Sequence, residues 1–177
     1  MALLLFLNLY IGINSHAADV AFLEVHDRRG QPIQLEPGGR FMHVAIRIGD
    51  KWLHAHSRAG VEVFEDLGEV GDRSLILRNR SVPEPKWIDY QHWLGKPFDF
   101  HYSWTRADAT YCARLVADLL NVAPAPMAFS AEIWKDHAYR EEATGAQGLS
   151  PDDLFRALLG RGYGPVIDCE RRLEKAS

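Results

Sequence analysis

Alternating apolar and polar positions run through the first half of the chain, and they predict β-strands. Residues 41–48 alternate with period two, so that His43 and Ala45 share one face while Val44 and Ile46 share the other. Similar short runs, bounded by turn residues, cover 19–25, 52–55, 60–64 and 74–78. Short strands at this spacing predict a meander that forms a small curled antiparallel sheet or partial barrel.

Helical patterns dominate the second half of the chain. A short helix is expected over 85–94, ended by Gly95. Residues 112–120 carry apolar side chains at helical spacing, which places Cys112 on the buried stripe near the start of that helix. A last helix is predicted over 150–160, with a serine N-cap, a proline at its first position and a closing glycine. The elements together predict an α+β fold.

Composition supports one globular domain. The chain has 177 residues, of which 47% are hydrophobic and 25% charged, as in an average soluble protein. A formal net charge of -4 provides no electrostatic reason to expect a nucleic-acid partner. Nothing in the composition reveals the oligomeric state.

The first seventeen residues form an apolar run that ends in small residues at Ser15 and Ala17. This pattern predicts a signal peptide over 1–17 and a domain over 18–177, in a periplasmic or secreted protein. The run lacks Lys and Arg, so an extension packed on the domain of a cytoplasmic protein is the alternative. It is too short and interrupted to predict a stable membrane span.

Cys112 is the first candidate for chemistry. At the start of a helix it meets unpaired backbone N–H groups and the positive end of the helix dipole, which favour thiolate and hold an oxyanion. The alternative is a small buried hydrophobe that happens to be cysteine. The only other cysteine, Cys169, lies in a polar segment and is interpreted as an incidental free thiol.

His43 is the candidate general base for that cysteine, although a histidine in an apolar strand is often a core residue. A hairpin through Gly49-Asp50 would bring His54 beside it on the next strand. His54 could then accept a hydrogen bond from the ring N–H of His43 and set its tautomer. His56 lies on the same face as His54 and is the alternative orienting residue.

Aromatic residues concentrate over 87–104, just before the cysteine. Most are expected to pack the helix on the sheet, whereas Tyr102, Trp104 and Tyr111 are candidates to line a substrate groove. The histidines at 26, 54 and 56 match no zinc-ligand spacing, so the sequence predicts neither a metal nor another cofactor.

Several fragments, taken in order, resemble a known superfamily. Residues 43–46, 53–55 and 60–61 resemble the histidine region of NlpC-type cysteine peptidases, and residues 111–116 resemble their nucleophile helix. Because the histidine precedes the cysteine, the chain is most similar to the circularly permuted branch, the YiiX/YaeF-like permuted papain-like amidases. Further similar fragments are residues 18–22, 94–99 and 149–154. Departures from the family pattern are His54, where many permuted members have an acidic residue, Ala113 in place of serine, and Phe98 in place of tyrosine.

The resemblance implies a permuted papain-like fold and amide hydrolysis through an acyl-thioester. In it Cys112 is the nucleophile, His43 moves the proton and His54 orients His43. Implied substrates are cell-wall peptides, including peptidoglycan fragments, or other amide-linked amino acids. A lipid acyltransferase or thioesterase, or an inactive binding module, would use the same residues. A deep apolar groove would favour lipid, and a cleft with acidic groups would favour peptides.

Overall fold

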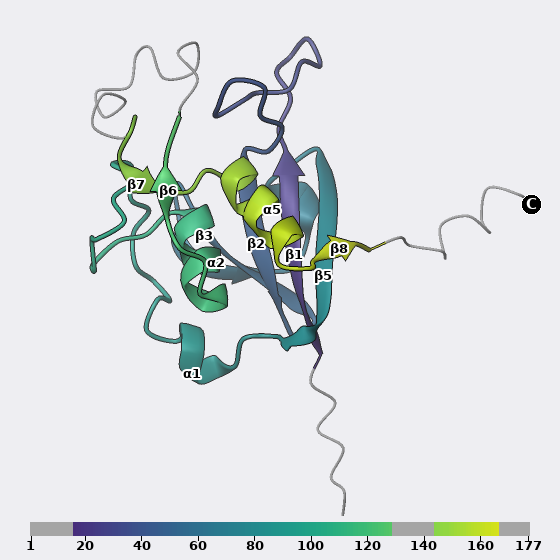
Figure 1. Cartoon of the computed structure of the whole chain (residues 1–177), viewed down its shortest axis with the longest axis vertical. Coiled ribbons are helices and arrows are strands. Elements are labelled where there is room, and N and C mark those ends of the chain that lie inside the picture. Colours follow the sequence, from purple (N-terminus) through teal and green to yellow (C-terminus); the bar gives the residue numbers. More distant parts are fainter. Residues whose placement is uncertain (1–15, 129–143, 167–177) are drawn as a thin grey trace, which may run out of the picture.

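The computed structural model describes residues 16–128 and 144–166. A six-stranded sheet forms its centre, with every neighbouring pair antiparallel. In spatial order the strands are β4 (Gly60–Phe64), β3 (Lys51–His56), β2 (His43–Ile48), β1 (Ala17–Glu24), β5 (Arg73–Pro83) and β8 (Gly164–Pro165) (Figure 1). In the described residues β4 and β8 are edge strands, so the sheet is open.

The meander prediction holds for β1 to β4 and is wrong for β5, which pairs with β1 on the other side of the sheet. The connection between β4 and β5 contains a 3-10 helix, η1 (Leu67–Glu69). Leu67 and Val70 from this connection pack on one face of the sheet against the buried residues Ala21, Leu23, Ala45, Trp52 and Phe64. The chain therefore crosses that face before it forms β5.

Three helices accompany the sheet in the described residues: α1 (Trp87–Tyr90), α2 (Cys112–Leu120) and α5 (Pro151–Gly160) (Figure 1). α2 and α5 cover the face of the sheet opposite η1. The side chains of this face and of the two helices form the main hydrophobic core. A two-stranded sheet of β6 (Ala125–Pro126) and β7 (Gln147–Gly148) lies beside them. The prediction of an α+β fold with a mainly antiparallel sheet is confirmed.

The predicted helix over 85–94 is shorter in the structure, where α1 ends at Tyr90. The residues after it turn back to the edge strand β4. The backbone N–H of Gly95 donates to the carbonyl of Val61, and that of Val61 donates to the carbonyl of Lys96, both at 2.8 Å. A helix continuing through this segment would lose both bonds, because its N–H groups would point along the helix axis.

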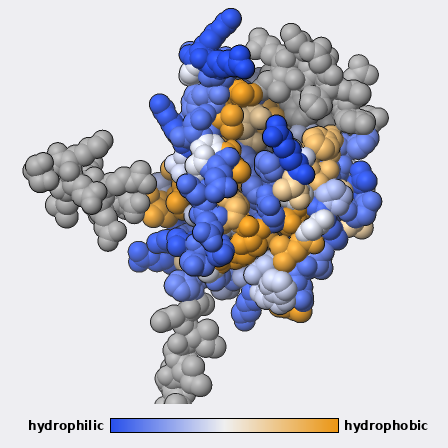
Figure 2. Space-filling model, turned by 180° about the vertical axis from the view of Figure 1, so that it is seen from behind, coloured by the Kyte–Doolittle hydropathy of each residue, from blue (hydrophilic) through white to orange (hydrophobic). Residues whose placement is uncertain are grey.

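The face of the molecule opposite to the one in Figure 1 is mainly hydrophilic, with hydrophobic residues gathered in a few patches (Figure 2). The large hydrophobic side chains exposed among the described residues are Val63, Trp87, Ile88, Phe100 and Leu159. Within residues 16–128 and 144–166, no helix is long and apolar enough to cross a bilayer. The run predicted as a signal peptide lies outside the described residues, except for its last two, His16 and Ala17.

Candidate active site

Cys112 is the first residue of α2, and Tyr111 before it has the extended backbone of an N-cap residue. The thiol is buried, with 5% of the residue exposed. Burial raises the pKa of the Cys112 thiol to about 11, whereas backbone N–H groups of Val44, Ala113 and Cys112 itself lower it. The expected helix-start stabilisation therefore exists, but desolvation is larger and the resting group is a neutral thiol.

The segment before Cys112 is held by a buried arginine on the same helix. The Arg114 guanidinium donates to the carbonyls of Ser103, Arg106 and Ala109, and it lies 5.5 Å from the Trp93 ring centre. The three carbonyls belong to different parts of the loop, so one guanidinium holds the loop backbone at three points.

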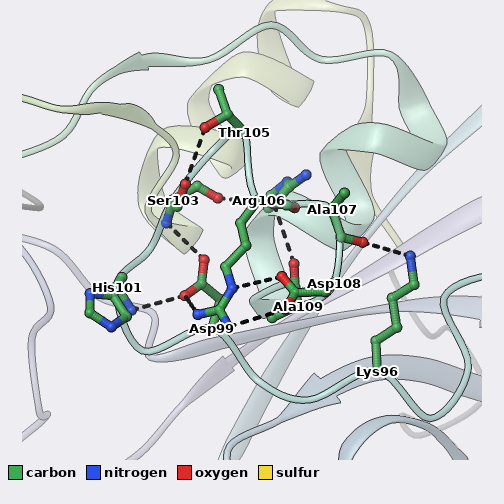
Figure 3. Close-up of polar contacts among 10 residues, drawn as sticks. Lys96, Asp99, His101, Ser103, Thr105, Arg106, Ala107, Asp108 and Ala109 are labelled. Atoms are coloured by element: carbon green, nitrogen blue, oxygen red, sulfur yellow. Dashed lines mark hydrogen bonds and ion pairs between the residues drawn. The ribbon is translucent and has the colours of Figure 1, made fainter.

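A second buried charge organises the same loop. The Asp99 carboxylate accepts from the backbone N–H groups of His101 at 3.1 Å and Ser103 at 3.0 Å, and Arg106 approaches it to 3.5 Å (Figure 3). The Lys96 ammonium donates to the Ala107 carbonyl at 2.8 Å. These contacts give the segment before Cys112 a defined shape without regular secondary structure.

His43 begins β2, next to Val44, whose N–H reaches the cysteine sulfur. The Nε2 atom of His43 lies 2.8 Å from Nδ1 of His54, and Nε2 of His54 lies 3.4 Å from Oε1 of Glu62. Strand pairing produces this order, because β3 and β4 pair with His54 opposite Glu62. The residues form a relay that runs across three neighbouring strands.

The Glu62 carboxylate at the end of the relay determines which ring nitrogens of His54 and His43 carry a proton. A carboxylate only accepts hydrogen bonds, so Nε2 of His54 carries the proton that it donates to Glu62. Nδ1 of His54 is then an acceptor, and His43 donates to it from Nε2. This leaves Nδ1 of His43 with a free lone pair, which is the form that a general base requires.

Both imidazoles are neutral near pH 7. Burial is the main cause that lowers the pKa of His43 to about 3, and nearby His54 and His56 lower it further. Burial also lowers the pKa of His54 to about 4, against the opposing effect of Glu62. The structure records no hydrogen bond between the Cys112 sulfur and the ring of His43, two described residues that face one cavity.

His56 is placed differently from His54. Its Nδ1 lies 3.9 Å from the Glu62 carboxylate, and its ring stacks on that of His54 at 5.5 Å. Of the two orienting candidates, His54 is the one in hydrogen-bonding contact with His43. Glu62 was missed from the sequence, although extending the predicted pairing of 52–55 with 60–64 across the connecting turn would have placed it opposite His54.

Cys112 and His43 line a cavity of about 350 Å³. Tyr102 and Tyr111 line it too, and the Tyr111 hydroxyl accepts a hydrogen bond from the backbone N–H of Leu149 at 3.1 Å. Trp104 is not among the residues around this cavity and borders two open surface depressions instead. The structure thus brings together five of the six predicted site residues. Four of them line the cavity, and the fifth, His54, is hydrogen-bonded to His43.

No family model and no curated protein matches the chain. Among solved structures it is similar to that of metalloprotein yiiX from Escherichia coli O157:H7, assigned to DUF1105. The two are 18% identical, the match covers 86% of this chain and 96% of that one, and the TM-score is 0.60. At this identity the likeness shows the fold alone, so the chain has a YiiX-like α+β fold.

That structural neighbour is described as a metalloprotein, and a metal ion in this chain would need several donor side chains gathered around one point. Within residues 16–128 and 144–166, no group of three or more His, Cys, Asp or Glu side chains is arranged to hold one. Both ring nitrogens of His54 already have partners in His43 and Glu62. The described residues therefore do not fit a resident metal.

Proposed function

We propose that this protein is a cysteine hydrolase with a permuted papain-like fold that cleaves an amide bond through an acyl-thioester at Cys112. The observation that carries the proposal is the relay of His43, His54 and Glu62, which leaves an unprotonated His43 nitrogen at the cavity that contains the cysteine. A core histidine needs no such chain of partners ending in a carboxylate.

The first half of the reaction transfers the acyl group. Nδ1 of His43 takes the thiol proton while the Cys112 sulfur attacks the substrate carbonyl, and the C=O electron pair moves to oxygen. Backbone N–H groups at the start of α2 stabilise that oxyanion. The C–N bond then breaks, His43 gives its proton to the departing nitrogen, and an amine leaves.

The second half releases the acid. A water molecule gives a proton to His43 and attacks the thioester carbonyl, and the Cys112 sulfur leaves with the proton that His43 returns. His54 and Glu62 contribute by holding the His43 ring and stabilising its transient positive charge. Cell-wall peptides or other amide-linked amino acids in the periplasm are the proposed substrates, supported by the family resemblance and the apolar N-terminal run.

Acyl transfer to the cysteine tests the proposal directly. Full-length protein is incubated with para-nitrophenyl acetate, and its intact mass is measured over time. We expect one acetyl adduct in the wild type and in Cys169→Ala, and none in Cys112→Ala. An adduct that persists in Cys112→Ala, or none in any of the three, would overturn the proposed function.

A further inference from the structure

We infer that the cavity beside Cys112 accepts an uncharged apolar acyl group, which among the proposed substrates favours an amino acid amide-linked to an apolar acid over a cell-wall peptide. This inference rests on the proposed function, because it concerns the acyl group that Cys112 would carry. Three features support it: the apolar walls of the cavity, a path of aromatic rings, and a single carboxylate among the lining residues.

The walls of the cavity are mainly apolar, and they come from separate parts of the chain. The connection between β1 and β2 contributes Leu35 and Met42, the residue after η1 contributes Val70, and the start of α5 contributes Pro151. The cavity is also lined by His56, Ser57 and Ser150, but the thioether and aliphatic side chains provide no partner for a peptide backbone. A polar acyl segment that lies against them would lose its hydrogen bonds to water on entry.

A continuous path of rings leads from solvent to the nucleophile. Phe100 is 43% exposed and packs on Phe98 at 5.0 Å between ring centres; Phe98 meets Tyr102 at 6.1 Å, and Tyr102 meets Tyr111 at 5.1 Å. Tyr111 is buried and directly precedes Cys112. An exposed phenylalanine at the outer end of this path is the feature expected where an apolar ligand enters.

Charge acts against anionic acyl groups. Glu69 is the one carboxylate among the residues that line the cavity, and it lies on the exposed part of η1. Its like charge disfavours an acyl chain that ends in a carboxylate, whereas a neutral chain meets no such repulsion. The cavity therefore selects against two kinds of acyl group, the polar and the negatively charged.

A series of para-nitroanilides tests the inference on the full-length protein. The acyl groups are acetyl, hexanoyl and glutaryl, and release of para-nitroaniline gives kcat/KM for each. We expect hexanoyl to exceed acetyl by about tenfold or more, because each methylene held in an apolar pocket adds discrimination. Glutaryl, with a chain of similar length that ends in a carboxylate, is expected to fall to the acetyl value or below.

Variants locate the selectivity. Phe100→Ser is expected to lower the hexanoyl-to-acetyl ratio severalfold, whereas Ile88→Ser, at a more exposed apolar site on α1 outside the cavity, leaves the ratio unchanged. Equal rates for acetyl and hexanoyl, or a preference for glutaryl, would overturn the inference while acyl transfer to Cys112 still stands. Absence of any acyl-Cys112 adduct would instead overturn the proposed function, and the inference with it.

Discussion

Burial leaves both members of the proposed catalytic pair uncharged at neutral pH. With a thiol pKa of about 11 and a His43 pKa of about 3, the thiolate–imidazolium pair is a minor form of the free protein. Proton transfer must then accompany attack on the substrate. A bound carbonyl favours this step, because the charge passes from sulfur to an oxygen that backbone N–H groups stabilise.

Alkylation kinetics test the charge state of the cysteine. In a Cys169→Ala background, the rate of Cys112 modification by iodoacetamide is expected to keep rising as pH increases from about 7 toward about 10, since the thiolate fraction grows throughout. Mass spectrometry of the protein at timed intervals measures it. A rate that is already maximal at neutral pH would show a preformed thiolate and contradict the raised pKa.

Glu62 is predicted to act as a positioning residue through His54. Glu62→Gln keeps an acceptor for the His54 N–H but removes the charge that stabilises a protonated relay, so kcat should fall by about tenfold or more with little change in KM. Glu65→Gln is the matched control, because Glu65 is exposed, directly follows β4 and pairs with Lys51 of β3 instead of a histidine. An equal loss of kcat in both variants would contradict a positioning role for Glu62. A loss of thermal stability in Glu62→Gln that accounts for its lower kcat would contradict it as well.

At the scale of elements, the N-terminus of α5 holds one side of the site together. Ser150 caps the helix by accepting from the Asp153 N–H at 2.9 Å, and its hydroxyl donates to the buried Glu36 at 2.7 Å. Asp152 accepts from the backbone N–H groups of Arg40 and Phe41. The connection between β1 and β2, which supplies part of the cavity wall, is thereby tied to α5.

Loss of this tie should appear as loss of stability. Ser150→Ala removes a helix cap and leaves the buried Glu36 with one donor fewer, so the free energy of unfolding should fall by about 1–2 kcal/mol. Chemical denaturation measures the difference. Ser81→Ala, at an exposed position of β5, is expected to change stability by less than about 0.5 kcal/mol, and a similar cost in both variants would show that the cap contributes nothing specific.

At the scale of the whole molecule, the buried histidines make the fold sensitive to acid. Above about pH 6.5 both are neutral in the folded and unfolded chains. As pH falls below that value the unfolded chain binds protons, whereas the folded chain resists until about 4 at His54 and about 3 at His43. Stability is therefore lost across this window, and the raised pKa of Asp152, caused mainly by burial, opposes part of the loss.

Denaturation near neutral pH and at about pH 5 measures this dependence. Each buried imidazole contributes up to about 1.4 kcal/mol per pH unit inside the window. His54→Phe, which preserves packing on Phe64, should flatten the dependence, whereas the exposed His92→Gln should leave it as in the wild type. An unchanged slope in His54→Phe would contradict the lowered pKa of that histidine.

Strand periodicity was enough to predict most of the sheet, because alternation records which side of a strand is buried. It predicted β2, β3 and β4 to within two residues at each end, and it placed His54 next to His43. It could not predict that β5 pairs with β1, since the partner of a strand depends on where the preceding connection crosses the sheet. The bonds that join Gly95 and Lys96 to Val61 of β4 were equally beyond local pattern, because they too depend on a tertiary contact.

Local pattern in the sequence determined the residue types of the site, the helix start at Cys112 and the strands that carry the histidines. Tertiary structure alone decided the position of Trp104 outside the cavity and the neutral state of the thiol. The physical reason is that hydrogen-bond direction and side-chain periodicity act over a few residues. Burial, and with it every pKa in the site, depends on which distant segments come to lie against one another.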